Sequence, residues 1–326
     1  MEIKAKILAN DGISEIGKQK LETAGFYVSV QKVEQDRLAE VINKENYEVL
    51  LVRSATKVRK ALIDACPNLK LIGRGGVGLD NIDVQYAEEK GITVINTPGA
   101  SSQSVAELTI AHMFTLARFL YDSNRQMPVI GESNFKELKK KYGKGIELRN
   151  KTLGIIGFGR IGQCVAEYAL GLGMKVMAYD PFIERATINL NINGTAKVQI
   201  GIVTSSLNEI LQNADFITVH VPKQENGNAV IGEEQFQLMK DGVFVINTAR
   251  GGIIDEKALI KYLDNGKVAA AALDVFENEP TPNSDLLTHP KISLSPHIGA
   301  ATIEAQDRIG EELAAQIITF FKKLKR

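Results

Sequence analysis

The sequence predicts an α/β protein with two domains built on mostly parallel β-sheets. The chain has 326 residues, which is about twice the length of an ordinary domain. Short apolar segments alternate with amphipathic segments in both halves, a pattern typical of parallel strands joined by helices. In the second half the apolar segments are nearly continuous, as expected for strands that helices cover on both faces.

The first hundred residues supply the strands of the first expected sheet. These strands are residues 5–9, 26–30, 48–54, 69–74 and 92–96. The amphipathic stretches 16–24 and 36–43 between them predict helices. Residues 101–120 predict one long apolar helix that Ser101 or Ser102 caps, and we expect this helix to be buried between domains or subunits.

The second half begins with a polar, turn-rich segment at residues 131–151, which predicts a connection. A second series of expected strands follows, at residues 152–157, 175–180, 214–221, 242–248, 269–276 and 291–297. Residues 160–172 predict a helix directly after the first of these strands. Residues 301–325 predict a final amphipathic helix.

Composition excludes several classes of protein. The 39 basic and 39 acidic residues give a net charge of zero, so no nucleic-acid partner is expected. Two cysteines, Cys66 and Cys164, cannot form a disulfide framework, which favours a reducing cytoplasm. The first ten residues are too short and polar for a signal peptide, and no apolar run approaches the ~18 residues needed to cross a bilayer. We therefore expect a cytoplasmic protein with no membrane partner.

A glycine turn followed by an acid predicts a dinucleotide site. Gly157, Gly159 and Gly162 match G-x-G-x-x-G between an expected strand and an expected helix. Such glycines allow a tight turn, close approach of a pyrophosphate to the backbone, and close helix–strand packing. Asp180 ends the next strand, where it can bind both ribose hydroxyls and repel a 2′-phosphate, so NAD is favoured over NADP. The alternatives are a glycine turn without a ligand and an Asp-Pro turn starter.

Three later side chains predict a catalytic site at strand ends. Arg250 follows a strand and precedes two glycines, where its guanidinium can hold a substrate carboxylate. His297 lies in a turn after a proline and can move a proton near neutral pH. Glu279 is the expected partner that orients this imidazole. The alternative for Arg250 is a surface position or a structural ion pair.

The other histidines and the metal-binding patterns carry less information. His112 lies on the apolar helix and is expected in the core, whereas His289 is expected at the surface. The segment His220-Val221-Pro222 follows a strand, where its backbone can line a nucleotide cleft. The histidines lack metal-ligand spacing and neither HExxH nor CxxC occurs, so we expect no metal.

A nicotinamide cofactor, a carboxylate clamp and a proton shuttle are the parts needed to interconvert 2-hydroxy and 2-oxo acids. The residues that suggest them lie in segments that resemble the D-isomer-specific 2-hydroxyacid dehydrogenase family. The segments are residues 96–113, 152–166, 247–259, 271–280 and 295–306. Residues 52–58 and 73–83 are most similar to the D-3-phosphoglycerate dehydrogenase branch of that family.

The resemblance implies two doubly wound parallel-sheet domains. Residues 1–100 and 298–326 would form a discontinuous, flavodoxin-like substrate domain. Residues 101–297 would form a Rossmann-type NAD domain inserted into it. The family is typically dimeric or tetrameric through the helix at 101–120, so a homodimer or homotetramer is expected.

The resemblance also implies the site residues. Arg250, Glu279 and His297 would be the catalytic set. The cofactor would meet the glycine turn, Asp180, the 220–222 segment, Arg250 and His297. The further expected cofactor contacts are Arg160 and Ile161 at the pyrophosphate, Asp274 near the nicotinamide amide, and Val77, Thr248, Ala249 and Gly299 along the cleft.

The substrate implied by the resemblance is a phosphorylated 2-hydroxy acid, 3-phospho-D-glycerate, oxidised to 3-phosphohydroxypyruvate in the first step of serine biosynthesis. Arg250 and His297 would meet its reacting end. The other expected substrate residues are Arg53, Lys57 and Arg74 for the phosphate, and Ser54, Gly76 and Val77 for the carboxylate. Residues 139–141, three lysines, either reach a neighbouring subunit's site or form a solvated run.

Two alternatives for the function stay open at this point. The first keeps the chemistry but acts on glyoxylate, hydroxypyruvate or another D-2-hydroxy acid. The second is a non-catalytic NAD(H)-sensing protein. Because the printed sequence ends at Arg326, directly after its last expected helix, we do not expect serine feedback through a C-terminal regulatory module.

Overall fold

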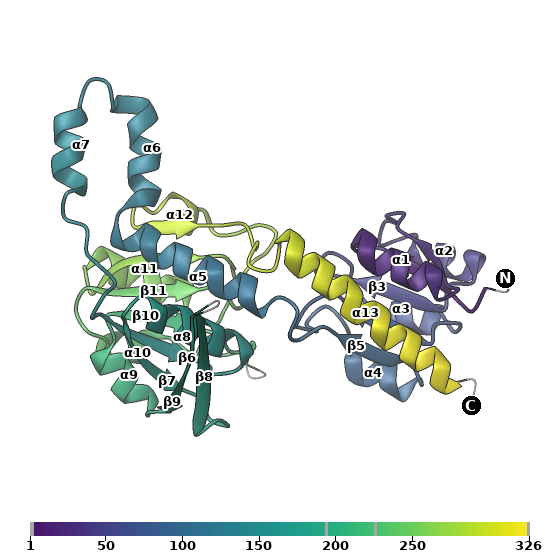
Figure 1. Cartoon of the computed structure of the whole chain (residues 1–326). Coiled ribbons are helices and arrows are strands. Elements are labelled where there is room, and N and C mark those ends of the chain that lie inside the picture. The colour runs from purple at the N-terminus through teal and green to yellow at the C-terminus, as the bar shows by residue number, and fades with distance from the viewer. Residues whose placement is uncertain (1–2, 193–194, 225–226, 325–326) are drawn as a thin grey trace. The chain divides into compact units, whose positions relative to one another are not determined.

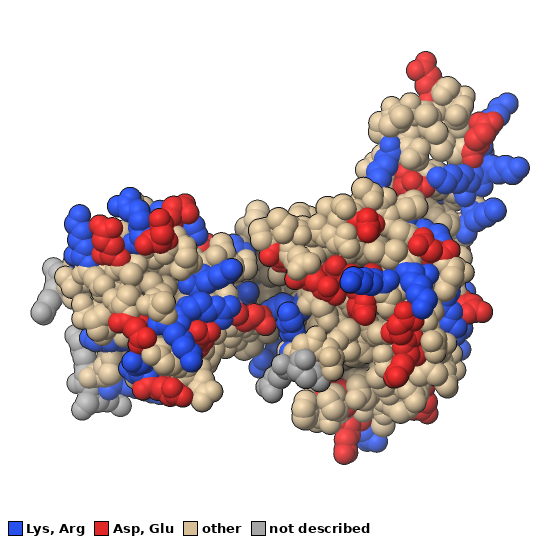
Figure 2. All heavy atoms as spheres, turned by 180° about the vertical axis from the view of Figure 1, so that it is seen from behind, with Lys and Arg blue, Asp and Glu red and all other residues tan. Residues whose placement is uncertain are grey.

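The computed structural model describes residues 3–192, 195–224 and 227–324, and the chain divides into two compact units. Unit 1 comprises Met1–Ser102 and Ala300–Arg326, and unit 2 comprises Gln103–Gly299. No helix among these residues is long and apolar enough to cross a membrane. Acidic and basic side chains are intermixed on the face shown in Figure 2.

Unit 1 is built on a five-stranded parallel sheet with the order β2-β1-β3-β4-β5. Its strands are β1 (Lys6–Ala9), β2 (Tyr27–Ser29), β3 (Val49–Val52), β4 (Leu71–Arg74) and β5 (Thr93–Asn96). This is the flavodoxin-like order, in which the strand sequence reverses at β1. The doubly wound, flavodoxin-like architecture expected for this part of the chain is confirmed.

Helices cover both faces of this sheet (Figure 1). One apolar cluster joins the sheet to α1 (Glu15–Thr23) and to α13 (Ile303–Leu324), which returns from the far end of the sequence. A Cβ on Gly17 would lie 2.6 Å from Gly310 Cα, so glycine lets α1 and α13 touch along their backbones. The other cluster includes side chains of α2 (Leu38–Glu45), α3 (Lys60–Ala65) and α4 (Val84–Glu89).

Unit 2 contains a six-stranded parallel sheet with the order β13-β12-β11-β10-β6-β7. Its strands are β6 (Thr152–Ile156), β7 (Lys175–Tyr179), β10 (Phe216–Val219), β11 (Val243–Asn247), β12 (Val268–Leu273) and β13 (Ile292–Leu294). The chain leaves β6 towards β7 on one side and reaches β10 on the other. Doubly wound sheets bind ligands at such a switch point, beyond the carboxyl ends of the strands.

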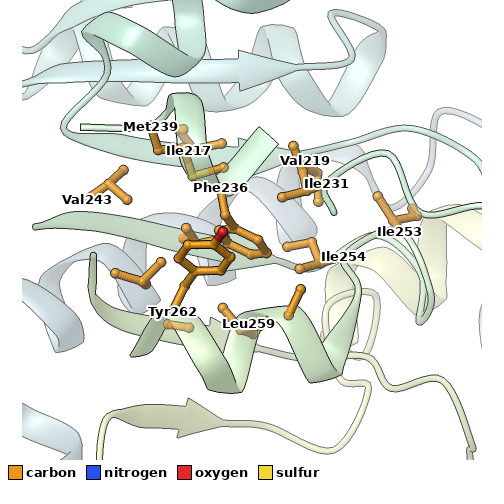
Figure 3. Close-up of a cluster of buried hydrophobic side chains, with 14 of the residues drawn as sticks. Ile217, Val219, Ile231, Phe236, Met239, Val243, Ile253, Ile254, Leu259 and Tyr262 are labelled. Atoms are coloured by element: carbon orange, nitrogen blue, oxygen red, sulfur yellow. The ribbon is translucent and has the colours of Figure 1, made fainter. Parts of the chain in front are cut away.

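Two apolar clusters cover the faces of the second sheet. One contains side chains of α5 (Ser102–Ala117) and α8 (Arg160–Gly171). The other contains side chains of α9 (Leu207–Asn213), α10 (Glu233–Leu238), α11 (Glu256–Asp264) and α12 (Ser284–Thr288). In this second cluster the rings of Phe236 and Tyr262 stack with centroids 5.1 Å apart (Figure 3).

The helix expected at residues 101–120 is interrupted. α5 ends at Ala117, Phe119 takes a left-handed conformation with φ of 56°, and α6 (Leu120–Ile130) follows. The expected connection at 131–151 contains a further helix, α7 (Phe135–Tyr142), which pairs with α6 as a hairpin (Figure 1). The segment was expected as a connection because it is mostly polar: Leu138 is the one buried residue of this helix, and three lysines follow it.

An antiparallel hairpin occupies residues for which the sequence predicted no strand. β8 (Arg185–Ile192) and β9 (Ala196–Val203) pair with each other directly after β7. Ile188 and Ile202 are buried while many of their neighbours are exposed. This alternation along both segments is the sequence signal that could have revealed the hairpin.

Candidate active site

The glycine turn lies between β6 and α8 and packs against the end of β10. Gly157 has a φ of 95°, and a Cβ there would lie 2.5 Å from the His220 carbonyl oxygen. A Cβ on Gly162 would overlap the Gly157 carbonyl, so glycine lets α8 start close to the turn. Gly159 is different, because nothing lies within 4 Å of its Cβ position. Its backbone therefore borders open space, as a pyrophosphate site at a helix N-terminus requires.

Asp180 holds the other side of this turn. Its Oδ2 accepts a 2.8 Å hydrogen bond from Phe158 N, and its Oδ1 accepts a 2.9 Å bond from Phe182 N. Each carboxylate oxygen has two lone pairs, so both retain capacity for a hydroxyl donor. Arg160 is exposed at the first residue of α8, beside half-buried Ile161. This donor and acceptor set fits the pyrophosphate and ribose of a dinucleotide.

His220 gives a second, independent sign of a ligand at the switch point. Its Nε2 lies 3.0 Å from Thr218 Oγ1, but its buried Nδ1 has no partner among the described residues. Burial lowers the pKa of His220 to about 3, so the imidazole is neutral at physiological pH. A buried polar atom without a partner is rare in folded proteins, and a ligand or water normally supplies the missing bond. Val221 beside it is half-buried and Pro222 is exposed.

Arg250 lies in the turn that follows β11. The side chain is half-buried, and Nη1 donates to the Ala249 carbonyl at 2.7 Å. The next residue is Gly251, where a Cβ would overlap the carbonyl oxygen of Phe276. Only glycine lets the turn after β11 lie directly against the loop after β12. The arginine and the loop that carries Glu279 are thereby brought together.

Glu279 and His297 form a hydrogen-bonded pair. Glu279 Oε2 lies 2.7 Å from His297 Nδ1, and Glu279 Oε1 accepts from Phe276 N at 3.0 Å. The two side chains are 35% and 37% exposed, respectively. His297 Nε2 has no partner among the described residues, so it is the nitrogen left to exchange a proton with a ligand. A carboxylate on Nδ1 fixes that tautomer.

The turn that carries His297 is held by a buried carboxylate. Asp274 is 1% exposed and accepts from Ser295 Oγ at 2.6 Å, Ile298 N at 2.9 Å and Gly299 N at 2.8 Å. These bonds span His297, whose φ of 55° lies in the left-handed region. The structure thus links Asp274 directly to the turn that carries His297. Its expected contact with the nicotinamide amide remains a proposal.

A buried histidine extends this network. Ser295 Oγ donates to Asp274, so it accepts from His112 Nε2, which lies 3.0 Å away. Burial lowers the pKa of His112, and the Coulomb attraction of Asp274 opposes that shift only in part. The sequence predicts a core position for His112 but does not indicate that His112 or Ser295 is linked to the turn that carries His297. The two are 183 residues apart in the sequence.

The remaining predicted residues of unit 2 are placed as follows. Thr248 and Ala249 are buried, and Thr248 Oγ1 lies 2.9 Å from Thr109 Oγ1. His289 was expected at the surface, but it is 8% exposed and its Nε2 lies 3.3 Å from Asp264 Oδ1. Lys141 pairs with Asp122 at 2.6 Å within the α6–α7 hairpin.

The substrate candidates of unit 1 follow β3 and β4. Ser54 and Lys57 are exposed, and Arg53 is half-buried at a pocket of about 520 Å³. Gly76 is buried and its N–H donates to Thr97 Oγ1 at 2.8 Å, so this amide is already used within the protein. Of the two remaining substrate candidates, Arg74 is half-buried and Val77 is 38% exposed. Among the described residues of the whole chain, no group of three potential metal ligands occurs.

Comparison with known proteins identifies the family. The model of the D-isomer specific 2-hydroxyacid dehydrogenase NAD binding domain matches residues 110–299. A hydroxypyruvate reductase of Thermotoga maritima is 45% identical over 312 residues, which cover 95% of this chain and 93% of that protein. The chain belongs to the D-isomer-specific 2-hydroxyacid dehydrogenase family. Its cofactor is NAD, and its unit 2 contains the family's NAD-binding domain.

Members of the family with a different name are nearly as similar. A D-3-phosphoglycerate dehydrogenase of Methanocaldococcus jannaschii is 44% identical over 96% of this chain, but the chain spans only 56% of that protein. The crystal structure of an NAD⁺-bound 3-phosphoglycerate dehydrogenase of Entamoeba histolytica matches with a TM-score of 0.76 and 30% identity, over 98% of this chain and 95% of that one. The family's dehydrogenase activity on D-2-hydroxy acids is thus the established level of function.

Proposed function

We propose that this protein oxidises 3-phospho-D-glycerate to 3-phosphohydroxypyruvate with NAD, as the first step of serine biosynthesis in the cytoplasm. The observation that carries the proposal is a cationic loop in unit 1. Within the described residues, neither the Arg53 guanidinium nor the Lys57 ammonium has a carboxylate partner. An unpaired guanidinium that lines a pocket, with an unpaired ammonium in the same loop, is suited to a phosphate, whereas a substrate without a phosphate would leave both unused.

The residues of unit 2 supply the chemical step in this proposal. The Arg250 guanidinium holds the substrate carboxylate with two parallel hydrogen bonds. Nε2 of His297 accepts the proton of the C2 hydroxyl, and Glu279 stabilises the imidazolium through Nδ1. Bound NAD supplies the nicotinamide ring that accepts the hydride from C2. In the reverse direction His297 returns the proton and Arg250 polarises the oxo oxygen.

NAD itself is held by the residues around the glycine turn in this proposal. The open backbone at Gly159 and the N-terminus of α8, with Arg160, bind the pyrophosphate. Asp180 accepts bonds from the adenosine ribose hydroxyls and disfavours the 2′-phosphate of NADP. His220 offers its unpaired Nδ1 nearby.

A substrate panel tests the proposal. The kcat/KM for 3-phosphohydroxypyruvate reduction should exceed that for hydroxypyruvate and glyoxylate by about ten- to a hundredfold. This factor corresponds to the ~1.5–3 kcal/mol of one charged hydrogen bond. Equal values for phosphorylated and unphosphorylated acids would remove the assignment.

A second candidate substrate is hydroxypyruvate itself. It is favoured by the similarity to the Thermotoga maritima hydroxypyruvate reductase, which is 45% identical over 95% of this chain. The same panel separates the two, since this candidate requires the unphosphorylated acid to be the better substrate. Turnover of none of the acids, with tight NADH binding, would favour an NAD(H)-sensing protein instead.

The oligomeric state is also a proposal. The α6–α7 hairpin exposes apolar side chains, among them Val129 at 76% and Phe135 at 57% exposure. Exposed apolar side chains gathered on one element mark interaction surfaces. We propose a homodimer in which this hairpin packs on a second copy of the chain. Light scattering should give twice the monomer mass for the wild type and a lighter particle for Val129→Glu.

A further inference from the structure

The loop at residues 53–56, which follows β3, is shaped by side chains from outside the loop. Ser54 and Ala55 are exposed at its tip, whereas Thr56 is 2% exposed. Within the described residues, the backbone N–H groups of Ser54 and Ala55 have no acceptor in the protein. The loop thus presents two adjacent free donors beside Arg53.

Asp11 holds the two ends of this loop by their N–H groups. Its Oδ2 accepts from Arg53 N at 2.7 Å and from Thr56 N at 3.0 Å. Its Oδ1 accepts from Thr56 Oγ1 at 2.7 Å and from Lys32 Nζ at 2.6 Å. The Asp11 side chain is only 5% exposed. Burial alone would raise its pKa, but these hydrogen bonds outweigh burial and lower it, so the carboxylate is charged at physiological pH.

Asn81 holds the same two residues by their carbonyl groups. Its Nδ2 donates to the Arg53 carbonyl at 2.8 Å and to the Thr56 carbonyl at 2.6 Å. The backbone carbonyl of Asn81 accepts a hydrogen bond from Val58 N at 2.8 Å, just beyond the loop. Asp11 and Asn81 therefore bind the N–H and the carbonyl group of both Arg53 and Thr56. Among the described residues, only the N–H groups at the tip of the loop are left without an acceptor.

We propose that Asp11 and Asn81 are positioning residues that keep the 53–56 loop ready to receive the anionic end of the substrate. Their bonds hold the free amides of Ser54 and Ala55 in one conformation before the substrate arrives. A loop that is ordered in advance loses less entropy when it binds, so substrate affinity rises. This inference rests on the proposed function, because it assigns the anionic end of the substrate to this loop.

Because Asp11 is negatively charged, loss of its charge and loss of its positioning role should change KM in opposite directions. A buried negative charge beside the loop repels an anionic substrate, so Asp11→Asn without loss of position should lower KM. An asparagine can accept through one oxygen only, so it cannot serve all four donors that the carboxylate now serves. Loss of position should therefore raise KM, in the direction opposite to the charge effect.

The experiment compares Asp11→Asn and Asn81→Ala with the matched control Glu34→Gln in the full-length protein. Asn81→Ala removes the two donated hydrogen bonds without adding a negative charge beside the loop. Glu34 is an exposed carboxylate two residues after Lys32, and among the described residues no hydrogen bond or ion pair joins its side chain to the loop. The assay measures KM and kcat for the acid that the wild type turns over best, and Kd for NADH. Hydrogen–deuterium exchange of the peptide spanning residues 53–58 reports the order of the loop.

We expect both variants to raise KM by about tenfold or more, with kcat and the Kd for NADH nearly unchanged, and to exchange the loop amides faster. The control should match the wild type. An unchanged or lower KM would overturn the inference, whatever the exchange shows. Equal losses in kcat, KM and NADH binding would reduce the two residues to a general structural role. If the best acid is unphosphorylated and its KM still rises, the proposed substrate fails and the positioning role stands; if no acid turns over, both fall.

Discussion

Replacement of Glu279 by glutamine tests the proposed catalytic role of the Glu279–His297 pair most directly. The carboxylate now accepts from two donors, His297 at 2.7 Å and Phe276 N at 3.0 Å. A glutamine side chain has one oxygen and an NH₂ group, so it can accept from only one of them and presents N–H to the other. Either His297 loses its acceptor or the loop after β12 loses its anchor.

The expected loss follows from the geometry of the pair. Two unit charges 2.7 Å apart attract by about 1.5 kcal/mol at the dielectric constant of water and by about 6 kcal/mol at an effective value of 20. Since each side chain is more than a third exposed, the value lies towards the aqueous limit. The range for hydrogen bonds to charged groups, ~1.5–3 kcal/mol, is consistent with this limit. The corresponding decrease in kcat/KM is about ten- to a hundredfold.

Steady-state reduction of the best 2-oxo acid measures this decrease, with NADH affinity measured in parallel. The matched control is Glu277→Gln, which removes an exposed carboxylate two positions earlier in the same loop. Among the described residues, its side chain accepts one hydrogen bond, from Glu256 N at 3.5 Å, so we expect activity close to that of the wild type. A Glu279→Gln variant as active as this control would refute the orienting role of Glu279.

Four further changes have expected outcomes. His297→Ala should reduce kcat by about 10²–10⁴ through lost proton transfer, while calorimetry still detects NADH binding; loss of that binding would make His297 structural. Asp180→Ala should weaken NAD binding by about ten- to a hundredfold and relax the discrimination against NADP, and an unchanged kinetic preference would remove Asp180 from the ribose site. The wild type should lose about 2 kcal/mol more of its free energy of unfolding than His220→Gln when the pH falls from 7.5 to 5.0, as measured by urea unfolding. The reason is that His220 of the unfolded chain binds a proton below pH 6.5, whereas the buried imidazole, with a pKa of about 3, does not. Parallel pH curves for the two proteins would contradict this. Gly251→Ala should destabilise the protein by about 1–3 kcal/mol because its Cβ overlaps Phe276 O, and an unchanged melting temperature would show that the two loops can separate.

The features that depend on a local pattern of residues could be predicted from the sequence. The G-x-G-x-x-G turn and Asp180 are set by a strand, a tight turn and a helix within about thirty residues. The parallel sheets followed from the alternation of apolar and amphipathic segments, and their strand orders agree with the expected fold class. The hairpin of β8 and β9 was not predicted, because its period-2 pattern lies among segments with a different periodicity.

Contacts between segments that are far apart in the sequence could not be predicted from it. Asp11 meets Thr56 across 45 residues, and His112 meets Ser295 across 183. Each of these residues is unremarkable in its own segment, since an aspartate after a strand or a histidine on a helix has many possible roles. Only the sheet order brings the ends of β1 and β3 together, and with them the donors that Asp11 accepts from.

The return of α13 to α1 has a consequence for how the protein is made. Unit 2 is continuous in the sequence, whereas the face of α1 that packs on α13 stays uncovered until residues 303–324 have left the ribosome. Unit 1, whose larger segment precedes unit 2 in the sequence, is therefore the last to complete its core. A nascent chain halted before α13 should show a protease-resistant unit 2 and a cleavable N-terminal third.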